Sequence, residues 1–448
     1  MTQSSPTVKL LRALGIAALL SIGIFVTWML VSDREFQSKA ARESIAQGWG
    51  GPQTIAGPEL SIPFKTTSPP AINAQGQVVS AGTLVERRLI LAPAGVDAAT
   101  RIAPERRSRS IYEVVIYRAE TMGRATFALP ADLSRLGIPA GALELARAEI
   151  RFGVSDARGL SANPDIRNGG QRLALGPGGG TSLVPTGFYA PIDLTRTSPA
   201  RFSIDFRFAL RGNGAIGLAP RAGDTSWKVT SPWPNPSFTG SFLPESRTVT
   251  KDGFSAIYRI GNLALGRSLL FTDASEPSGN ASAEAPAARV ELMEPVNLYS
   301  QVDRATKYGF LFVGFTFLAF LLFDIIGGVR VAAIEYLLAG AALILFFVLL
   351  LALAEVIGFA PAYLIAAATI AGLNTAYSAA ILRSWRRGAV IGAILVGLYA
   401  MLYILLSLEA YSLLIGALLL LAALAGTMFV TRRIDWTGKG PEVVQPPL

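Results

Sequence analysis

Cysteine and histidine are both absent from this chain of 448 residues. Their absence excludes disulfides, Cys nucleophiles, Ser-His-Asp triads, and zinc or haem sites built from the usual ligands. Any catalysis would depend on carboxylates, Lys, Tyr or Ser alone. We therefore expect no catalytic, cofactor-binding or metal-binding residues, and a non-enzymatic role is the favoured interpretation.

Charge is also scarce, since only 16% of the residues are charged, where a soluble protein has about a quarter. The deficit lies in residues 301–434, which are dominated by apolar runs, whereas residues 32–300 have the composition of an ordinary soluble domain. The net charge is +9, but the basic residues are scattered or lie at the ends of apolar runs. This distribution indicates membrane topology and a lipid bilayer as the partner, with no nucleic acid.

Six apolar segments are long enough to cross a bilayer, which takes about 20 residues. They are residues 13–31, 309–326, 336–353, 361–382, 389–408 and 411–430. The first ends in Trp28, Met29 and Leu30 without a small-residue cleavage site, so we interpret it as a retained signal anchor. Residues 34–47 are predicted to prolong its helix.

The short basic flanks of these segments alternate with acidic ones. One set of flanks carries Lys9, Arg12, Arg330, Arg383, Arg386, Arg387, Arg432 and Arg433. The gaps between them carry Glu355 and Glu409 and no Lys or Arg. The exception is Arg304 and Lys307, which flank the second span on the external side; long translocated domains largely escape the rule. By the positive-inside rule, the basic side is cytoplasmic. We predict cytoplasmic tails at residues 1–12 and 435–448, and an external domain at residues 32–300 ahead of a five-helix bundle at 301–434.

The external domain shows the two-residue period of half-buried strands. Within residues 202–210, Phe202, Ile204 and Phe206 alternate with polar residues, and residues 149–154 repeat the pattern. The fold class is therefore a membrane protein with about six transmembrane helices. A large, mainly antiparallel β domain, sandwich-like in its expected arrangement, is inserted between helix 1 and helix 2.

The aromatic segment "SPWPNPSFTGSFLP", residues 231–244, contains four prolines and cannot form an interior strand. Trp233, Phe238 and Phe242 either pack against the sheet or are displayed as a candidate partner surface. The glycine run at 176–180 allows a similar choice between a plain loop and an anion cradle, although no strand-glycine-helix context supports a phosphate loop.

Polar residues near the apolar segments form two further candidate groups. Asp303, Arg304, Lys307 and Tyr308 precede the second span and form a candidate junction. The candidate membrane polar residues are Glu355, Asn374, Ser378 and Glu409. The two glutamates either lie in interfacial water or pair with Arg304 or Lys307. Asn374 and Ser378 share a helical face, and either line a substrate path or hydrogen-bond neighbouring helices.

Several stretches, taken in order, resemble the CreD family of inner-membrane proteins, also called cell-envelope integrity proteins. They include "GWGGPQTIAGPELSIPF" (48–64), "SDARGL" (155–160), "WPNPSFTGSFLP" (233–244), "PVNLYSQVDRATKYGFLF" (295–312) and "TRRIDW" (431–436). The resemblance implies a Gram-negative inner-membrane protein with a periplasmic domain. It also implies a link to envelope integrity, colicin tolerance and the response to β-lactams.

Three functions remain open from the sequence. The first is an envelope protein whose external domain binds a periplasmic protein or other envelope component. The second is a small transporter or lipid-handling protein that uses the bundle, although no inverted repeat supports it. The third is an envelope-polymer hydrolase that uses carboxylates or a Ser-Lys pair. The first is the prediction that we carry forward.

Overall fold

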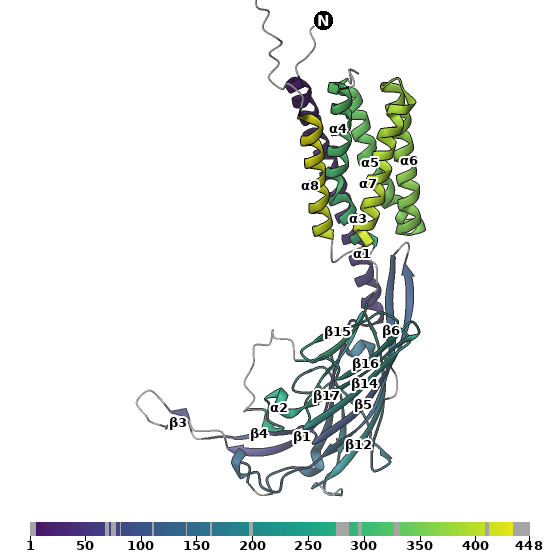
Figure 1. Ribbon diagram of the computed structural model, residues 1–448. Helices are drawn as coiled ribbons and strands as arrows, with labels where there is room; N and C mark the ends of the chain where they lie inside the picture. The colour runs from purple at the N-terminus through teal and green to yellow at the C-terminus, as the bar shows by residue number, and fades with distance from the viewer. Residues whose placement is uncertain are drawn as a thin grey trace, which may run out of the picture. The chain divides into compact units, whose positions relative to one another are not determined.

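The computed structural model describes residues 6–67, 71–72, 78–80, 82–109, 112–139, 141–161, 164–196, 200–274, 286–293, 298–326, 332–407 and 412–432. The chain divides into two compact units (Figure 1). Residues 1–39 and 296–448 form the helical unit, and residues 40–295 form the β unit. The boundary at residues 39 and 40 falls within one unbroken helix, α1 (Pro6–Trp49), which confirms the predicted extension of the first span.

The helical unit contains α1 up to Lys39 and six further helices. These are α3 (Leu298–Lys307), α4 (Gly309–Ile326), α5 (Ala333–Ile357), α6 (Phe359–Ile381), α7 (Trp385–Ser407) and α8 (Ser412–Thr431). Five described segments are long and apolar enough to cross a membrane; they lie in α1, in α3 with α4, and in α5, α6 and α7. In α8 the apolar stretch is the shorter Gly416–Phe429, so a sixth span remains a prediction.

Aromatic rings form the core of the helical unit where α4, α5, α6 and α7 meet. Phe346 of α5 lies 4.6 Å from Tyr399 of α7 and 5.5 Å from Tyr363 of α6, between ring centroids. Phe312 of α4 lies 4.9 Å from Tyr399. The Tyr363 hydroxyl donates to the Tyr399 carbonyl at 2.6 Å, so this buried polar group is paired.

Small residues allow α6 and α7 to approach closely. A Cβ atom added at Gly388 would lie 2.6 Å from the Cβ of Ala379, and one at Gly392 would lie 2.4 Å from the Thr375 Oγ1. Helix association in lipid depends on such close packing, because hydrocarbon provides no hydrophobic driving force between helices. The two glycines therefore act as packing residues of the α6–α7 contact.

The β unit contains two large sheets and one small one within its described residues. The first sheet has the strand order β10 (Gly176–Pro177), β11 (Gly187–Ile192), β7 (Ala148–Val154), β1 (Gln53–Thr67), β13 (Ala215–Ala219), β19 (Ala288–Leu292) and β15 (Pro236–Gly240), with β4 (Leu84–Leu91) paired to β1 and β18 (Leu270–Thr272) to β4. The second has the order β16 (Ser246–Thr250), β17 (Gly253–Gly261), β14 (Asp224–Ser231), β5 (Gly95–Arg109), β6 (Tyr112–Phe127), β12 (Phe202–Asn213), β8 (Asp165–Asn168) and β9 (Gln171–Arg172).

Shorter elements complete the β unit. They are the small sheet of β2 (Ala71–Ile72) and β3 (Val78–Ser80), helix α2 (Asn262–Leu265), and 3-10 turns at Ser134–Leu136, Leu145–Arg147 and Ala157–Gly159. Among the described strands, the β1–β13 and β5–β14 pairs are parallel and the other pairs are antiparallel. The predicted mainly antiparallel domain after the first span is therefore confirmed.

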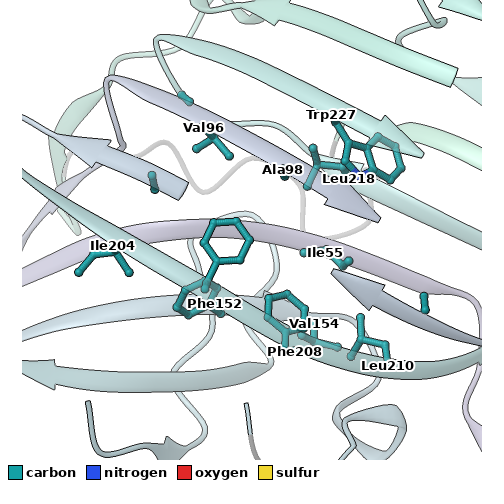
Figure 2. Packing of buried hydrophobic residues seen from close by; sticks show 14 of the residues in the cluster. Ile55, Val96, Ala98, Phe152, Val154, Ile204, Phe208, Leu210, Leu218 and Trp227 are labelled. Atoms are coloured by element: carbon teal, nitrogen blue, oxygen red, sulfur yellow. The ribbon is translucent and has the colours of Figure 1, made fainter. Parts of the chain in front are cut away.

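The core of the β unit lies between the two large sheets (Figure 2). Phe152 of β7 in the first sheet meets Phe206 and Phe208 of β12 in the second, with ring centroids 5.6 and 5.9 Å apart. Alternate residues of β12 are buried, as the two-residue period predicts. Burial of each large apolar side chain contributes about 1.5–3 kcal/mol, and this packing makes the unit a sandwich.

Exchange of two glycines of α7 for alanine tests the packing of the helical unit. Gly388→Ala should destabilise it by about 1–3 kcal/mol, because the new methyl group meets backbone atoms of Ala379. Gly397→Ala is the matched control, since no atom lies within 4 Å of its added Cβ. Thermal unfolding of the detergent-solubilised full chain should show a lower Tm for the first variant alone. Equal Tm values for both variants would contradict the close α6–α7 contact.

Candidate functional site

The predicted junction lies on α3, an amphipathic helix that precedes α4. Tyr299, Val302, Ala305 and Thr306 form its buried face. Asp303 lies beside this face, is partly buried and contacts two partners. The indole N–H of Trp28, in α1, donates to Asp303 Oδ1 at 3.0 Å, and the Lys307 Nζ lies 2.6 Å from Asp303 Oδ2. One carboxylate therefore joins α1 to α3 through hydrogen bonds strengthened by its charge.

The other junction residues have different surroundings. Arg304 and Tyr308 are half-buried. Tyr308 lies at the break between α3 and α4, where its backbone N–H donates to the carbonyls of Arg304 and Ala305. Its ring lies 3.9 Å from the position of a Cβ added at Gly416 of α8. The four predicted residues thus share one helix end, but Asp303 makes the contact with a distant helix.

Glu355 connects the end of α5 to the same α3 helix. Its Oε1 accepts a hydrogen bond from the Tyr299 hydroxyl at 3.2 Å. Lys307, one of its two predicted partners, pairs with Asp303 instead. Glu355 therefore contacts this stretch through Tyr299, which the sequence did not suggest, and its pairing with Arg304 stays a prediction. Glu409 lies outside the described residues.

Asn374 and Ser378 are buried on α6, with 1% and 0% of their surface exposed. Asn374 Nδ2 donates to the Ile370 carbonyl of its own helix at 3.2 Å. Within the described residues, Asn374 Oδ1 and Ser378 Oγ have no hydrogen-bond partner. Their enclosure favours a packing position over a wide, water-filled path.

The aromatic segment packs against the β unit. Trp233 is 8% exposed, its indole N–H donates to the Met293 carbonyl at 3.0 Å, and the Arg106 guanidinium lies 5.6 Å from its ring centroid. Phe238 and Phe242 are half-buried against the main core. These contacts favour packing for Trp233, whereas Phe238 and Phe242 each keep part of their surface exposed, and a role in partner binding stays a prediction. β15 lies at the sheet edge, as its prolines predict.

A groove lies beside the strand that follows this segment. Its volume is about 500 Å³. Its lining is rich in hydroxyl groups and consists of Arg101, Ile102, Ala103, Thr230, Ser231, Pro232, Thr248, Thr250, Asp252, Gly253, Phe254 and Ser255. All five residues of β16 are exposed, and among the described strands β16 pairs with β17 alone. Edge strands of this kind can accept an additional strand through their unpaired backbone groups.

The glycine run leads into a loop whose backbone does bind a carboxylate, but the carboxylate belongs to the protein. The Ser182 backbone N–H donates to Glu59 Oε2 at 2.8 Å, and its hydroxyl donates to Glu59 Oε1 at 2.6 Å. Arg221 Nη1 donates to the Ser182 Oγ at 2.7 Å. Glu59 and Arg221 are 1% and 5% exposed. This buried charged cluster holds the loop just after the glycine run, where the N–H groups of Gly178 and Gly180 donate to the carbonyls of Gly187 and Pro185.

Two of the stretches that carry the family resemblance meet at the end of α1. Asp156 Oδ2 accepts the Gly51 backbone N–H at 3.1 Å, and Gln53 Nε2 donates to the Asp156 carbonyl at 3.2 Å. The Arg158 guanidinium and nearby backbone N–H groups hold the pKa of Asp156 below its ordinary value. These hydrogen bonds hold the segment that follows α1 against the turn at Asp156. Among the described residues, no three Asp or Glu gather at a spacing suited to a metal ion.

Sequence reasoning missed Trp28, Tyr299, Glu59 and Arg221. A tryptophan near the end of an apolar segment could have been recognised as an interfacial residue. By contrast, Trp28 and Asp303 are 275 positions apart, so nothing local in the sequence indicates their contact. The Glu59–Arg221 pair likewise has no local signature.

Comparison with known proteins places the chain among inner-membrane proteins. The sequence profile of the family described as "Inner membrane protein CreD" matches residues 5–437. The protein of that name from Escherichia coli (strain K12) is 30% identical over 429 residues, which are 96% of this chain and 93% of that protein.

Among solved structures, a mutant M1 zinc metallopeptidase from Deinococcus radiodurans with a bound peptide substrate is 10% identical. It covers 45% of this chain and 42% of that one with a TM-score of 0.22, which is too low to bear on fold or activity. The family profile and the Escherichia coli relative each extend over nearly the whole chain. The chain therefore belongs to the CreD family of inner membrane proteins.

Proposed function

We propose that this chain contributes non-enzymatically to cell-envelope integrity and stress tolerance, and that its β unit lies in the periplasm and binds an envelope protein. The exposed edge strand β16, with its groove, is the observation that carries the proposal. A sandwich this large is inserted between two apolar spans, and membrane anchoring alone does not require it.

The groove and the edge strand favour an extended polypeptide as the bound component. Unpaired backbone groups of β16 can form main-chain hydrogen bonds with an added strand, which provides affinity. The hydroxyl groups of Thr230, Thr248, Thr250 and Ser255 provide donors and acceptors along the groove. Arg101 and Asp252 add one charge of each sign. The resulting surface suits a polar, extended segment of another protein.

In this proposal, α3 is the first helix of the bundle that the chain enters after the β unit, and it transmits the effect of binding. The chain reaches α3 shortly after β19, and the Asp303 carboxylate fixes α3 to α1. Glu355 fixes the same helix to α5 through Tyr299. A partner held by the β unit would therefore act on a helix that is tied to two membrane segments.

Single cysteines in this cysteine-free chain test the topology. Ser246 and Arg386 are both exposed, one on β16 and the other in the first turn of α7. In intact spheroplasts, a membrane-impermeant maleimide should label Ser246→Cys and should reach Arg386→Cys only after permeabilisation. The basic flank of α7 is the physical reason for this orientation. Labelling with the opposite pattern would reject a periplasmic β unit with cytoplasmic termini.

Photocrosslinking tests the groove. A photoreactive amino acid at Thr248, in the groove, should capture a polypeptide in intact cells, because the side chain faces the proposed partner. The same residue at the exposed Arg167 of β8, toward the other end of the same sheet, is the control and should capture none. Crosslinked products are detected by a shift in mobility and identified by mass spectrometry. Capture from Arg167 alone, or from both positions equally, would count against this site.

Three variants separate the contacts of the junction. Asp303→Ala removes both contacts, Trp28→Phe removes only the indole hydrogen bond, and Lys307→Ala removes only the ion pair. We expect Asp303→Ala and Trp28→Phe to impair tolerance to a β-lactam or a colicin at unchanged protein abundance. Lys307→Ala should have a small effect, since an exposed ion pair is worth about 0–1 kcal/mol. Full tolerance in the Asp303→Ala strain would show that the contact between α3 and α1 is not needed for the function.

A further inference from the structure

A cavity of about 680 Å³ lies at the turn between α6 and α7, within the helical unit. Its lining consists of Glu335, Ala380, Ile381, Leu382, Arg383, Ser384 and Arg387. Its volume is in the range of small-molecule sites, which extend from about 300 to 1,000 Å³. The site is distant from the groove of the β unit in sequence, and neither the family comparison nor the proposed function accounts for it.

The charge of the lining favours an anion. Arg383 and Arg387 contribute two guanidinium groups, and within the part of the chain that the structure describes neither forms an ion pair. Glu335 contributes one carboxylate, but its Oε2 accepts the backbone N–H of Ala332 at 2.7 Å. The cavity therefore retains an excess of positive charge. Planar guanidinium groups bind phosphate oxygens through paired hydrogen bonds.

The helix ends at the cavity reinforce this preference. α7 begins at Trp385, so the first-turn N–H groups beside Ser384 and Arg387 lack carbonyl partners within their own helix. The C-terminus of α6 carries the opposite, negative partial charge. This charge is partly compensated, because the carbonyls of Ser378, Ala379 and Ala380 accept backbone N–H groups from the turn. The local dipoles thus add to the charge of the arginines.

The backbone at Arg383 has an unusual conformation for its residue type. Its φ is 49°, in the left-handed region that glycine or asparagine adopts at a lower conformational free energy. An arginine at this position costs about 1 kcal/mol relative to glycine. A side chain retained in this conformation is consistent with a binding role, although the conformation alone does not define a ligand.

Interfacial residues near the cavity favour a lipid over a soluble anion. Trp385 is 72% exposed at the first position of an apolar helix, where tryptophans mark the headgroup level of a bilayer. Arg432, at the end of α8, stacks on Phe429 at 3.9 Å in the arrangement typical of an interfacial cation. Ala380, Ile381 and Leu382 supply the few apolar atoms of a lining that is mostly polar, which suits a headgroup. Basic pockets between helices at this level bind anionic lipid headgroups.

We propose that the α6–α7 cavity binds the phosphate headgroup of an anionic phospholipid through Arg383 and Arg387. The phosphate lies between the two guanidinium groups and near the first turn of α7. The acyl chains lie outside the cavity, because its lining is mostly polar. The site holds one lipid in a fixed position on the helical unit and does not depend on which side of the membrane this end faces.

Native mass spectrometry of the purified full chain in detergent tests the proposal. The wild-type protein should retain phosphatidylglycerol or cardiolipin over phosphatidylcholine. The double variant Arg383→Gln with Arg387→Gln should bind the anionic lipid at least about tenfold more weakly. Arg386→Gln is the matched control, because Arg386 lies on the same turn but does not line the cavity. It should bind as tightly as the wild type.

Each other outcome overturns the proposal. If the wild-type protein does not discriminate anionic from zwitterionic lipid, no headgroup site exists, whatever the variants do. If Arg386→Gln weakens binding as much as the double variant, the attraction is general surface charge. If millimolar inorganic phosphate displaces the lipid and binds equally well alone, the site takes a soluble anion.

The double variant Arg383→Lys with Arg387→Lys keeps the charge and is the positive control. It should bind the anionic lipid more tightly than the glutamine double variant does, which shows that the turn still folds.

Discussion

Hydrocarbon supplies no hydrogen bonds, and this constraint decides where the polar groups of the helical unit lie. Inside the bundle, the Tyr363 hydroxyl uses the Tyr399 carbonyl, and Thr375 uses the Ala371 carbonyl of its own helix. Among the described residues, Glu355 lies near the end of α5, and Asp303 lies on the short α3 that precedes α4. Because a charge is costly at the bilayer centre, such positions away from the middle of long apolar helices are where charged contacts are expected.

In the interior of the β unit, buried polar and charged groups likewise need partners within the protein. Glu59 and Arg221 are almost completely enclosed, and both contact Ser182. Removal of one partner would leave an uncompensated buried charge, which typically costs about 3–5 kcal/mol. The cluster fixes one loop rather than a ligand. The N–H and hydroxyl of Ser182, just after the glycine run, are therefore used by a carboxylate of the protein itself.

The sequence predicted the elements of the fold well and the contacts of the sites poorly. Apolar runs and two-residue alternation are local properties, so α5 and β12 could be located from a short window. The prolines likewise predicted that β15 lies at an edge. The Trp28–Asp303 contact joins residues 275 positions apart. Asp303 has the same local sequence whether or not Trp28 meets it, so only the tertiary structure could identify this contact.

The aromatic segment shows a second limit of local reasoning. Trp233 has the same neighbours in the sequence whether its ring is buried or displayed. Its burial depends on the Met293 carbonyl, which accepts the indole N–H, and on Arg106 beside the ring. Pairing of the indole N–H removes the main penalty for burying tryptophan. The partner surface proposed above therefore lies on the neighbouring edge strand, which the sequence did not distinguish from other strands.

The packing of the bundle also bears on conduction. A path for a solute needs a hydrated interior, but the rings of Phe346, Tyr363 and Tyr399 fill the space between α5, α6 and α7. Asn374 Oδ1 and Ser378 Oγ are unpaired within the described residues, and two enclosed atoms on one helix face do not make a continuous polar route. These contacts favour a bundle that anchors and orients. The proposed binding of a partner would then take place at surfaces outside the hydrocarbon. Polar groups there can bind without the desolvation cost that applies at the bilayer centre.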